Sequence, residues 1–145
     1  MRTVVVIAIL GLLFACQAEA TICTQKRIEL ERVQGIVLDD EGRSLLPGVV
    51  LTLSRVGGTL ERTETADGEG FFSFTSVPDG DYHFSAQLDG FLTLYAEIRV
   101  TTRSHLGQVL IAHLTQEFDG CGALEMATAR KARRLQRTMV NRGSR

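Results

Sequence analysis

The chain has 145 residues, of which 44% are hydrophobic and 23% are charged, and its formal net charge is −1 at pH 7. This length suits one compact domain with short attachments rather than two domains. The sequence contains neither a recognised nucleic-acid motif nor an aromatic stacking platform, which argues against nucleic acid as a partner.

The first twenty residues have the composition of an export signal. Arg2 supplies a positive start, residues 4–15 form an apolar stretch, and Ala18-Glu19-Ala20 supplies a small-residue cleavage site. The apolar stretch is about a dozen residues long, against the ~20 that a membrane-spanning helix needs. We therefore expect residues 1–20 to be a signal peptide and the protein to be secreted or periplasmic. A short membrane anchor is the alternative.

The three cysteines give information about where the protein is located after export. Leu13-Phe14-Ala15-Cys16 resembles a bacterial lipoprotein box, although Phe14 is bulky for its position. The alternative to a secreted or periplasmic protein is therefore one that is lipidated at Cys16 and anchored at the cell envelope. Cys23 and Cys121 flank the central region, and an oxidising compartment favours a bond between them. We predict this disulfide. Two free thiols or an intermolecular bond are the alternatives.

After an extension over residues 21–32, short apolar runs alternate with Gly, Pro and Asp turns, which set the spacing of β-strands. The pattern predicts strands at 33–38, 49–55, 60–66, 71–77, 82–88, 91–101 and 108–115. Spacings near 8 to 12 residues without a helical period favour an antiparallel sandwich. We expect an all-β domain over residues 33–118, with seven antiparallel strands, followed by a basic helical or disordered tail over residues 119–145.

The turn residues also carry a resemblance to a known family. The ordered series is Gly35-x-Val37, Asp40-x-Gly42, Leu46-Pro47-Gly48-Val49-x-Leu51, Thr65-x-Asp67-x-x-Gly70-x-Phe72-x-Phe74, Val77-Pro78-x-Gly80-x-Tyr82 and Gly90-Phe91. It resembles the carboxypeptidase regulatory-like domain. The resemblance implies an Ig-like or transthyretin-like, seven-stranded β-sandwich, classed with the starch-binding-like carbohydrate-binding folds. It also implies a non-catalytic accessory module of secreted and envelope proteins.

Residues for catalysis or metal binding are sparse. His83, His105 and His113 form no close pair on one predicted element, and hairpin chemistry accounts for the acidic turns. We therefore expect no catalytic residue, no metal site and no cofactor. The alternative is a small transthyretin-like hydrolase, which needs these histidines to converge with a carboxylate. Arg142-Gly143-Ser144 resembles the end of hydroxyisourate hydrolases, but Asn141 replaces the Tyr before it, and a basic helical segment precedes it.

Aromatic side chains are the candidates for a ligand face. Tyr82, Tyr95 and Phe91, together with Phe71, are the side chains on which a saccharide would stack, while the alternative is that they form the core. The expected function is a binding or structural module for a carbohydrate or an envelope protein. An enzyme and an envelope lipoprotein remain the alternatives.

The charge is divided along the chain. Residues 33–118 hold five arginines against twelve acidic residues, a net charge of −7, whereas residues after Cys121 hold seven basic residues against Glu125, a net charge of +6. Helix-forming residues fill 123–141. We expect either a solvated tail or electrostatic attachment to an anionic surface, such as lipid, an acidic envelope polymer or another copy. Its main cations are Arg130, Lys131, Arg133, Arg134 and Arg137.

Overall fold

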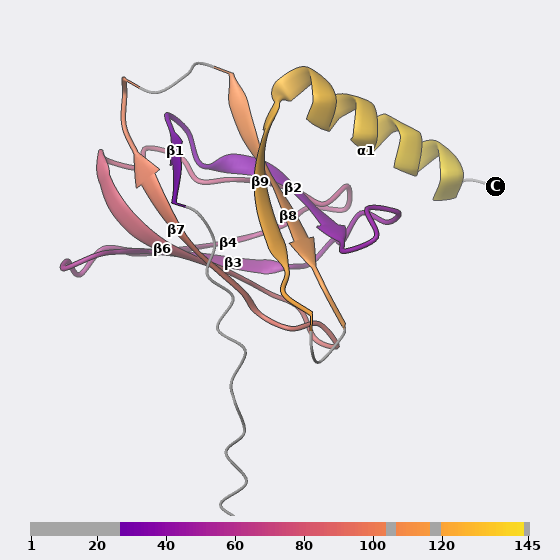
Figure 1. Ribbon diagram of the computed structural model, residues 1–145, viewed down its shortest axis with the longest axis horizontal. Coiled ribbons are helices and arrows are strands. Elements are labelled where there is room, and N and C mark those ends of the chain that lie inside the picture. Colours follow the sequence, from indigo (N-terminus) through magenta and orange to yellow (C-terminus); the bar gives the residue numbers. More distant parts are fainter. Residues whose placement is uncertain (1–26, 104–106, 117–119, 144–145) are drawn as a thin grey trace, which may run out of the picture.

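The structure, a computed structural model, describes residues 27–103, 107–116 and 120–143, which form nine strands and one helix (Figure 1). The strands build two sheets that pack face to face. The helix, α1 (Ala129–Gly143), lies against the outer face of one sheet, so that the molecule has three layers.

The first sheet has five strands in the order β1-β7-β6-β3-β4. Their bounds are β1 (Ile28–Leu30), β3 (Val50–Arg55), β4 (Glu61–Thr65), β6 (Gly80–Gln87) and β7 (Leu94–Val100). Strands β4, β3, β6 and β7 pair antiparallel, while β1 runs parallel to β7. Buried and exposed residues alternate along β6 and β7, as expected of a sheet with one face in the core.

The second sheet has four strands in the order β5-β2-β8-β9. Their bounds are β2 (Gln34–Asp39), β5 (Phe71–Ser73), β8 (Gln108–Leu114) and β9 (Ala123–Thr128). Strands β2 and β8 pair parallel, and the outer pairs are antiparallel. Strands β2 and β8 each contain four consecutive buried residues, because both faces of this sheet are covered.

Two apolar cores correspond to the two faces of the second sheet. The main core fills the space between the sheets and includes the buried side chains of Phe72, Tyr82, Phe84 and Leu110. The smaller core lies between the second sheet and α1. It contains Ile36, Leu38, Val109, Ile111, Ala127, Ala132 and Met139.

The mainly β architecture is confirmed, but the expectation of seven strands, all antiparallel, is wrong. All seven predicted strands form, and two more join them: β1 within the expected extension and β9 within the expected tail. The helix predicted from residue 123 begins at Ala129, because residues 123–128 pair antiparallel with β8 instead. Pairing makes both segments strands: β1 joins β7 about 70 residues later, and β9 joins β8, the strand directly before it. Local composition does not report such pairing.

Several predictions fall outside the described residues. These are the signal peptide over residues 1–20, the lipidation of Cys16, the bond from Cys23 to Cys121, and any role of His105. Within the part of the chain that the structure describes, no helix has both the length and the apolar character needed to cross a membrane.

Candidate anion-binding surface

Helix α1 begins directly where β9 ends. The hydroxyl of Thr128, the last residue of β9, accepts a hydrogen bond from the backbone N–H of Lys131 at 3.2 Å, which is the geometry of a helix N-cap. The residues that follow are rich in Ala, Arg, Leu and Gln, which have high helix propensity. The cap and this composition together explain why the chain changes from strand to helix at this residue.

The inner side of α1 holds the helix on the sandwich. Ala132 and Met139 are 6% and 8% exposed and pack on the second sheet, with Leu135 half-buried beside them. The side-chain amide of Gln136 donates a hydrogen bond to Oε2 of Glu69 at 3.1 Å, which ties the helix to the turn before β5. Among residues 120–143, the basic segment is therefore a docked helix and not a solvated tail.

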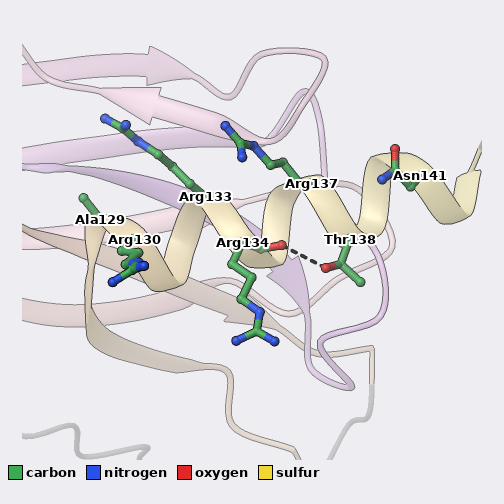
Figure 2. Close-up of a pocket in the computed structure, with 7 residues that line it drawn as sticks. All are labelled: Ala129, Arg130, Arg133, Arg134, Arg137, Thr138 and Asn141. Carbon is green, nitrogen blue, oxygen red and sulfur yellow. Dashed lines mark hydrogen bonds between the residues drawn. The ribbon is translucent and has the colours of Figure 1, made fainter.

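The outer side of α1 carries four arginines, Arg130, Arg133, Arg134 and Arg137, which we call the arginine face. They are spaced three and four residues apart, and this spacing places them on one side of a helix. Together with Ala129, Thr138 and Asn141 they line a shallow depression of about 770 Å³ along the helix. Figure 2 looks onto this side of the helix, with Arg133 and Arg137 extending from its upper edge and Arg134 from its lower edge.

Among the residues that the structure describes, no carboxylate forms an ion pair with the arginine face. Like charges one helical turn apart repel, and Arg130 also lies in the first turn, where the helix dipole disfavours a cation. No acidic residue occupies that turn. The arrangement therefore costs the folded helix free energy that a bound anion would offset.

Lys131 does not belong to this face, although the sequence grouped it with the arginines. Its ammonium lies 3.4 Å from Oε1 of Glu125 on β9, and the same carboxylate oxygen lies 3.7 Å from Nε2 of His113 on β8. Glu125 thus binds the flank of the helix to the sheet. The five predicted cations divide into four that face solvent together and one that forms a structural contact.

The aromatic ligand face is not formed as predicted. Tyr82 is fully buried in the main core, and its hydroxyl donates a hydrogen bond to the backbone oxygen of Pro78 at 2.8 Å. Phe91 is half-buried against the main core. Tyr95 is 69% exposed on the outer face of the first sheet, and Phe71, at 39%, lies on β5 in the second sheet. Tyr82 and Tyr95 thus lie on opposite faces of the first sheet, because alternate residues of a strand point in opposite directions.

A comparison with protein families decides the identity of the sandwich. A family model for the carboxypeptidase regulatory-like domain matches residues 32–112. The chain belongs to the carboxypeptidase regulatory-like domain family. The match covers β2 to most of β8, so β1, β9 and α1, including the arginine face, lie outside the matched segment.

Comparison with solved structures describes the fold of this family member further. A 5-hydroxyisourate hydrolase from Klebsiella pneumoniae is 17% identical with a TM-score of 0.51, and the match covers 68% of this chain and all of that chain. This likeness shows a transthyretin-like fold and nothing more. A 3-chlorocatechol 1,2-dioxygenase from Rhodococcus opacus 1CP is 12% identical with a TM-score of 0.38, over 70% of this chain and 62% of that one. No curated protein matches the chain.

The histidines of this carboxypeptidase regulatory-like domain do not gather where the structure describes them. His83 is exposed on the outer face of the first sheet, whereas His113 lies on β8 beside Glu125. Arg142 and Gly143 belong to α1, so the hydrolase-like tripeptide does not close a strand here. In residues 27–103, 107–116 and 120–143, no three His, Cys, Asp or Glu side chains come together in a geometry that holds a metal ion.

Proposed function

We propose that this chain is a non-catalytic β-sandwich module that acts outside the cytoplasm and attaches through α1 to an anionic phospholipid surface. One observation carries the proposal: a helix that is packed on the sandwich presents four arginines to solvent without an ion-pair partner among the described residues. The export signal expected from residues 1–20 supports the compartment.

The chemistry of the arginine face suits phosphate. A guanidinium donates two parallel hydrogen bonds to phosphate oxygens, and each cation near an anionic membrane contributes about 1 kcal/mol. The residues that line the depression beside the arginines are Ala129, Thr138 and Asn141, and the exposed apolar side chain of α1 is the short Val140. We therefore propose adsorption by charge, without insertion of the helix among the lipid chains.

The charge of the whole chain supports one orientation on the surface. The sandwich region carries −7 and the segment after Cys121 carries +6, so an anionic surface attracts α1 and repels the rest of the molecule. Because α1 is packed on the second sheet, the first sheet and its outer face point away from the lipid in this arrangement.

Flotation of the full chain with lipid vesicles tests the proposal. We expect binding to vesicles that contain phosphatidylglycerol, no binding to pure phosphatidylcholine, and a loss of affinity as salt rises. The double variant Arg133→Gln and Arg137→Gln should bind about 30-fold more weakly, because two cations at ~1 kcal/mol each are lost.

The matched control removes the same charge elsewhere. Arg27 and Arg55 are exposed at the first sheet, whereas α1 packs on the second sheet, and the double variant Arg27→Gln and Arg55→Gln should bind as the parent does. If both double variants lose affinity equally, binding depends on overall charge and the assignment to α1 is wrong. Absence of binding to phosphatidylglycerol vesicles at low salt would remove the proposed function altogether.

A further inference from the structure

A cleft of about 410 Å³ opens at the end of the sandwich where three connections meet. One wall is the link between β1 and β2, the second is the link between β5 and β6, and Thr102 after β7 contributes the third. The volume lies within the range of small-molecule sites. We call it the loop-end cleft. It is separate from the arginine face, and the two share no lining residue.

Hydrogen bonds to the framework fix the walls of the loop-end cleft. The backbone N–H of Phe74 donates to the oxygen of Val33 at 2.9 Å, which joins the first wall to the second. The guanidinium of Arg62 on β4 donates to the backbone oxygen of Thr75. The hydroxyl of the buried Tyr82 donates a hydrogen bond to the backbone oxygen of Pro78. Tyr82 is thus a positioning residue for this end of the sandwich.

Backbone strain lies inside the same cleft. Ser76 has a φ of 54°, and within the described residues it is the one non-glycine with a positive φ. A left-handed conformation is unfavourable for serine and persists only where the surroundings enforce it. Here its neighbour Thr75 is held by Arg62, and Pro78 is held by Tyr82. Such strain is typical of sites where a side chain is held in place for a ligand.

Many of the side chains that line the loop-end cleft carry a group that forms hydrogen bonds. Hydroxyls line it from Ser73, Thr75, Ser76 and Thr102. The carboxylate of Asp79 accepts hydrogen bonds from the backbone N–H and the hydroxyl of Thr102, both at 3.3 Å, and so bridges two walls.

The apolar and charged side chains that line the loop-end cleft indicate which class of ligand it can bind. Val77, which is half-buried, presents an apolar side chain to the loop-end cleft, whereas Val33 and Phe74 lie beneath it in the main core. The lining includes the carboxylates of Glu31 and Asp79 and the guanidinium of Arg32, while Arg55 and Arg62 donate hydrogen bonds to the backbone oxygens of Asp79 and Thr75. Charges of both signs are therefore present at the cleft, and neither sign dominates as it does on α1. A sugar ring matches this lining, because it offers hydroxyls at its edge, C–H groups on its faces and no charge.

We propose that the loop-end cleft binds one or two rings of a neutral saccharide. Asp79, Ser76 and Thr102 hold the sugar hydroxyls, and Val77 contacts a ring face. This site differs from the aromatic platform expected from the sequence, because Tyr82 supports the cleft from the core and Tyr95 projects from the outer face of the first sheet. It also stands independently of the attachment through α1.

The test is a titration of the ¹⁵N-labelled full chain with maltotriose, cellotriose and triacetylchitotriose, followed by amide chemical shifts. We expect saturable shifts over residues 73–79 and at Thr102 with at least one of the three sugars. Asp79→Asn should weaken that binding about 10-fold, and Thr102→Val about 3-fold to 10-fold, from the usual contribution of charged and neutral hydrogen bonds.

The same amide spectra, recorded for a control variant, show whether the effect is specific to the cleft. Thr63→Val changes an exposed threonine of β4 that does not line the cleft, and it should bind as the parent does. A lack of saturable shifts in the cleft with all three sugars overturns the proposal. Shifts centred on Tyr95 would also overturn it. The same holds if both cleft variants give the spectrum of a folded protein and bind the sugar with unchanged affinity. Vesicle binding by Asp79→Asn should match the parent, which separates this result from a failure of the arginine face.

Discussion

At the scale of single residues, Gly35 shows how closely β2 and β8 approach each other. It pairs with Leu110, and a Cβ added at Gly35 would lie 2.0 Å from the backbone oxygen of Leu110. That separation is shorter than any van der Waals contact, and the obstacle is backbone rather than a flexible side chain. The glycine is therefore required by the spacing of the two strands and not by a turn.

We expect Gly35→Ala to lower the free energy of unfolding by about 3 kcal/mol or more, because the parallel strands must move apart. Urea denaturation measures this change. Gly68→Ala is the matched control, since a Cβ there meets nothing within 4 Å, and its effect should stay within about 0.5 kcal/mol. Equal effects of the two substitutions would contradict the packing argument.

Asp81 and Arg99 form the main charge pair of the first sheet. Nε of Arg99 lies 2.8 Å from Oδ1 of Asp81, and Nη2 lies 3.1 Å from Oδ2. The hydrogen bonds from Arg99 hold the pKa of Asp81 below its ordinary value. Because the folded pKa is the lower one, the pair stabilises the fold fully above the unfolded pKa, near 3.9. That contribution is lost as the pH falls through the folded pKa.

We therefore expect Arg99→Gln to return the pKa of Asp81 toward its ordinary value, as measured by NMR titration of the carboxyl group. The difference in stability between parent and variant should be present at neutral pH and shrink as the pH falls below about 4. An unchanged pKa of Asp81 in the variant would show that Arg99 is not its cause.

At the scale of elements, turn chemistry predicts most of the sandwich. The side chain of Asp67 accepts hydrogen bonds from the backbone N–H groups of Glu69 and Phe71, both at 2.9 Å, which is the turn that its sequence indicates. β9 is different, because residues 123–128 have helix-forming composition and only pairing with β8 makes them a strand.

The candidate site was predictable only in part. The concentration of cations near the end of the chain is visible in the sequence, but the grouping of four arginines on one face depends on where the helix begins. The sequence also carries a signal that both faces of the second sheet are covered. Residues 109–112 of β8 form an unbroken apolar run, as do residues 36–38 of β2, and such runs indicate strands buried on both faces.

Docking of α1 on the second sheet is the element-scale prediction. Ala132→Glu places a charge in the smaller core, so we expect the helix to detach and its amides to lose protection from hydrogen exchange, while β6 and β7 keep theirs. Thr138→Glu is the control on the solvent side of the same helix, and it should leave α1 protected. Retained protection in Ala132→Glu would contradict the docking described above.

At the scale of the whole molecule, the predicted bond between Cys23 and Cys121 would tie both flanks of the sandwich together. Cys23 lies outside the described residues, so the bond stays a prediction. A loop of about 100 residues implies ~4 to 5 kcal/mol of stabilisation in the chain-entropy model. Intact mass of the exported protein before and after reduction and alkylation tests it, and reduction should lower the unfolding midpoint.

The same mass distinguishes the two export outcomes. A chain that begins at Thr21 indicates cleavage of the signal peptide, whereas a diacylglyceryl group on Cys16 indicates a lipoprotein. Two thiols that react before reduction would show that the disulfide is absent.

The parallel pairing of β2 with β8 also constrains how the chain is made. β3, β4, β6 and β7 are neighbours along the chain and can assemble once Val100 has been synthesised. β2 can pair with β5 before that, but it must wait for its other neighbour, β8, about 75 residues later, and for the helix that covers its outer face. A ribosome-bound or truncated chain therefore carries Ile36, Val37 and Leu38 uncovered, and the second strand to be synthesised is among the last to be protected from aggregation.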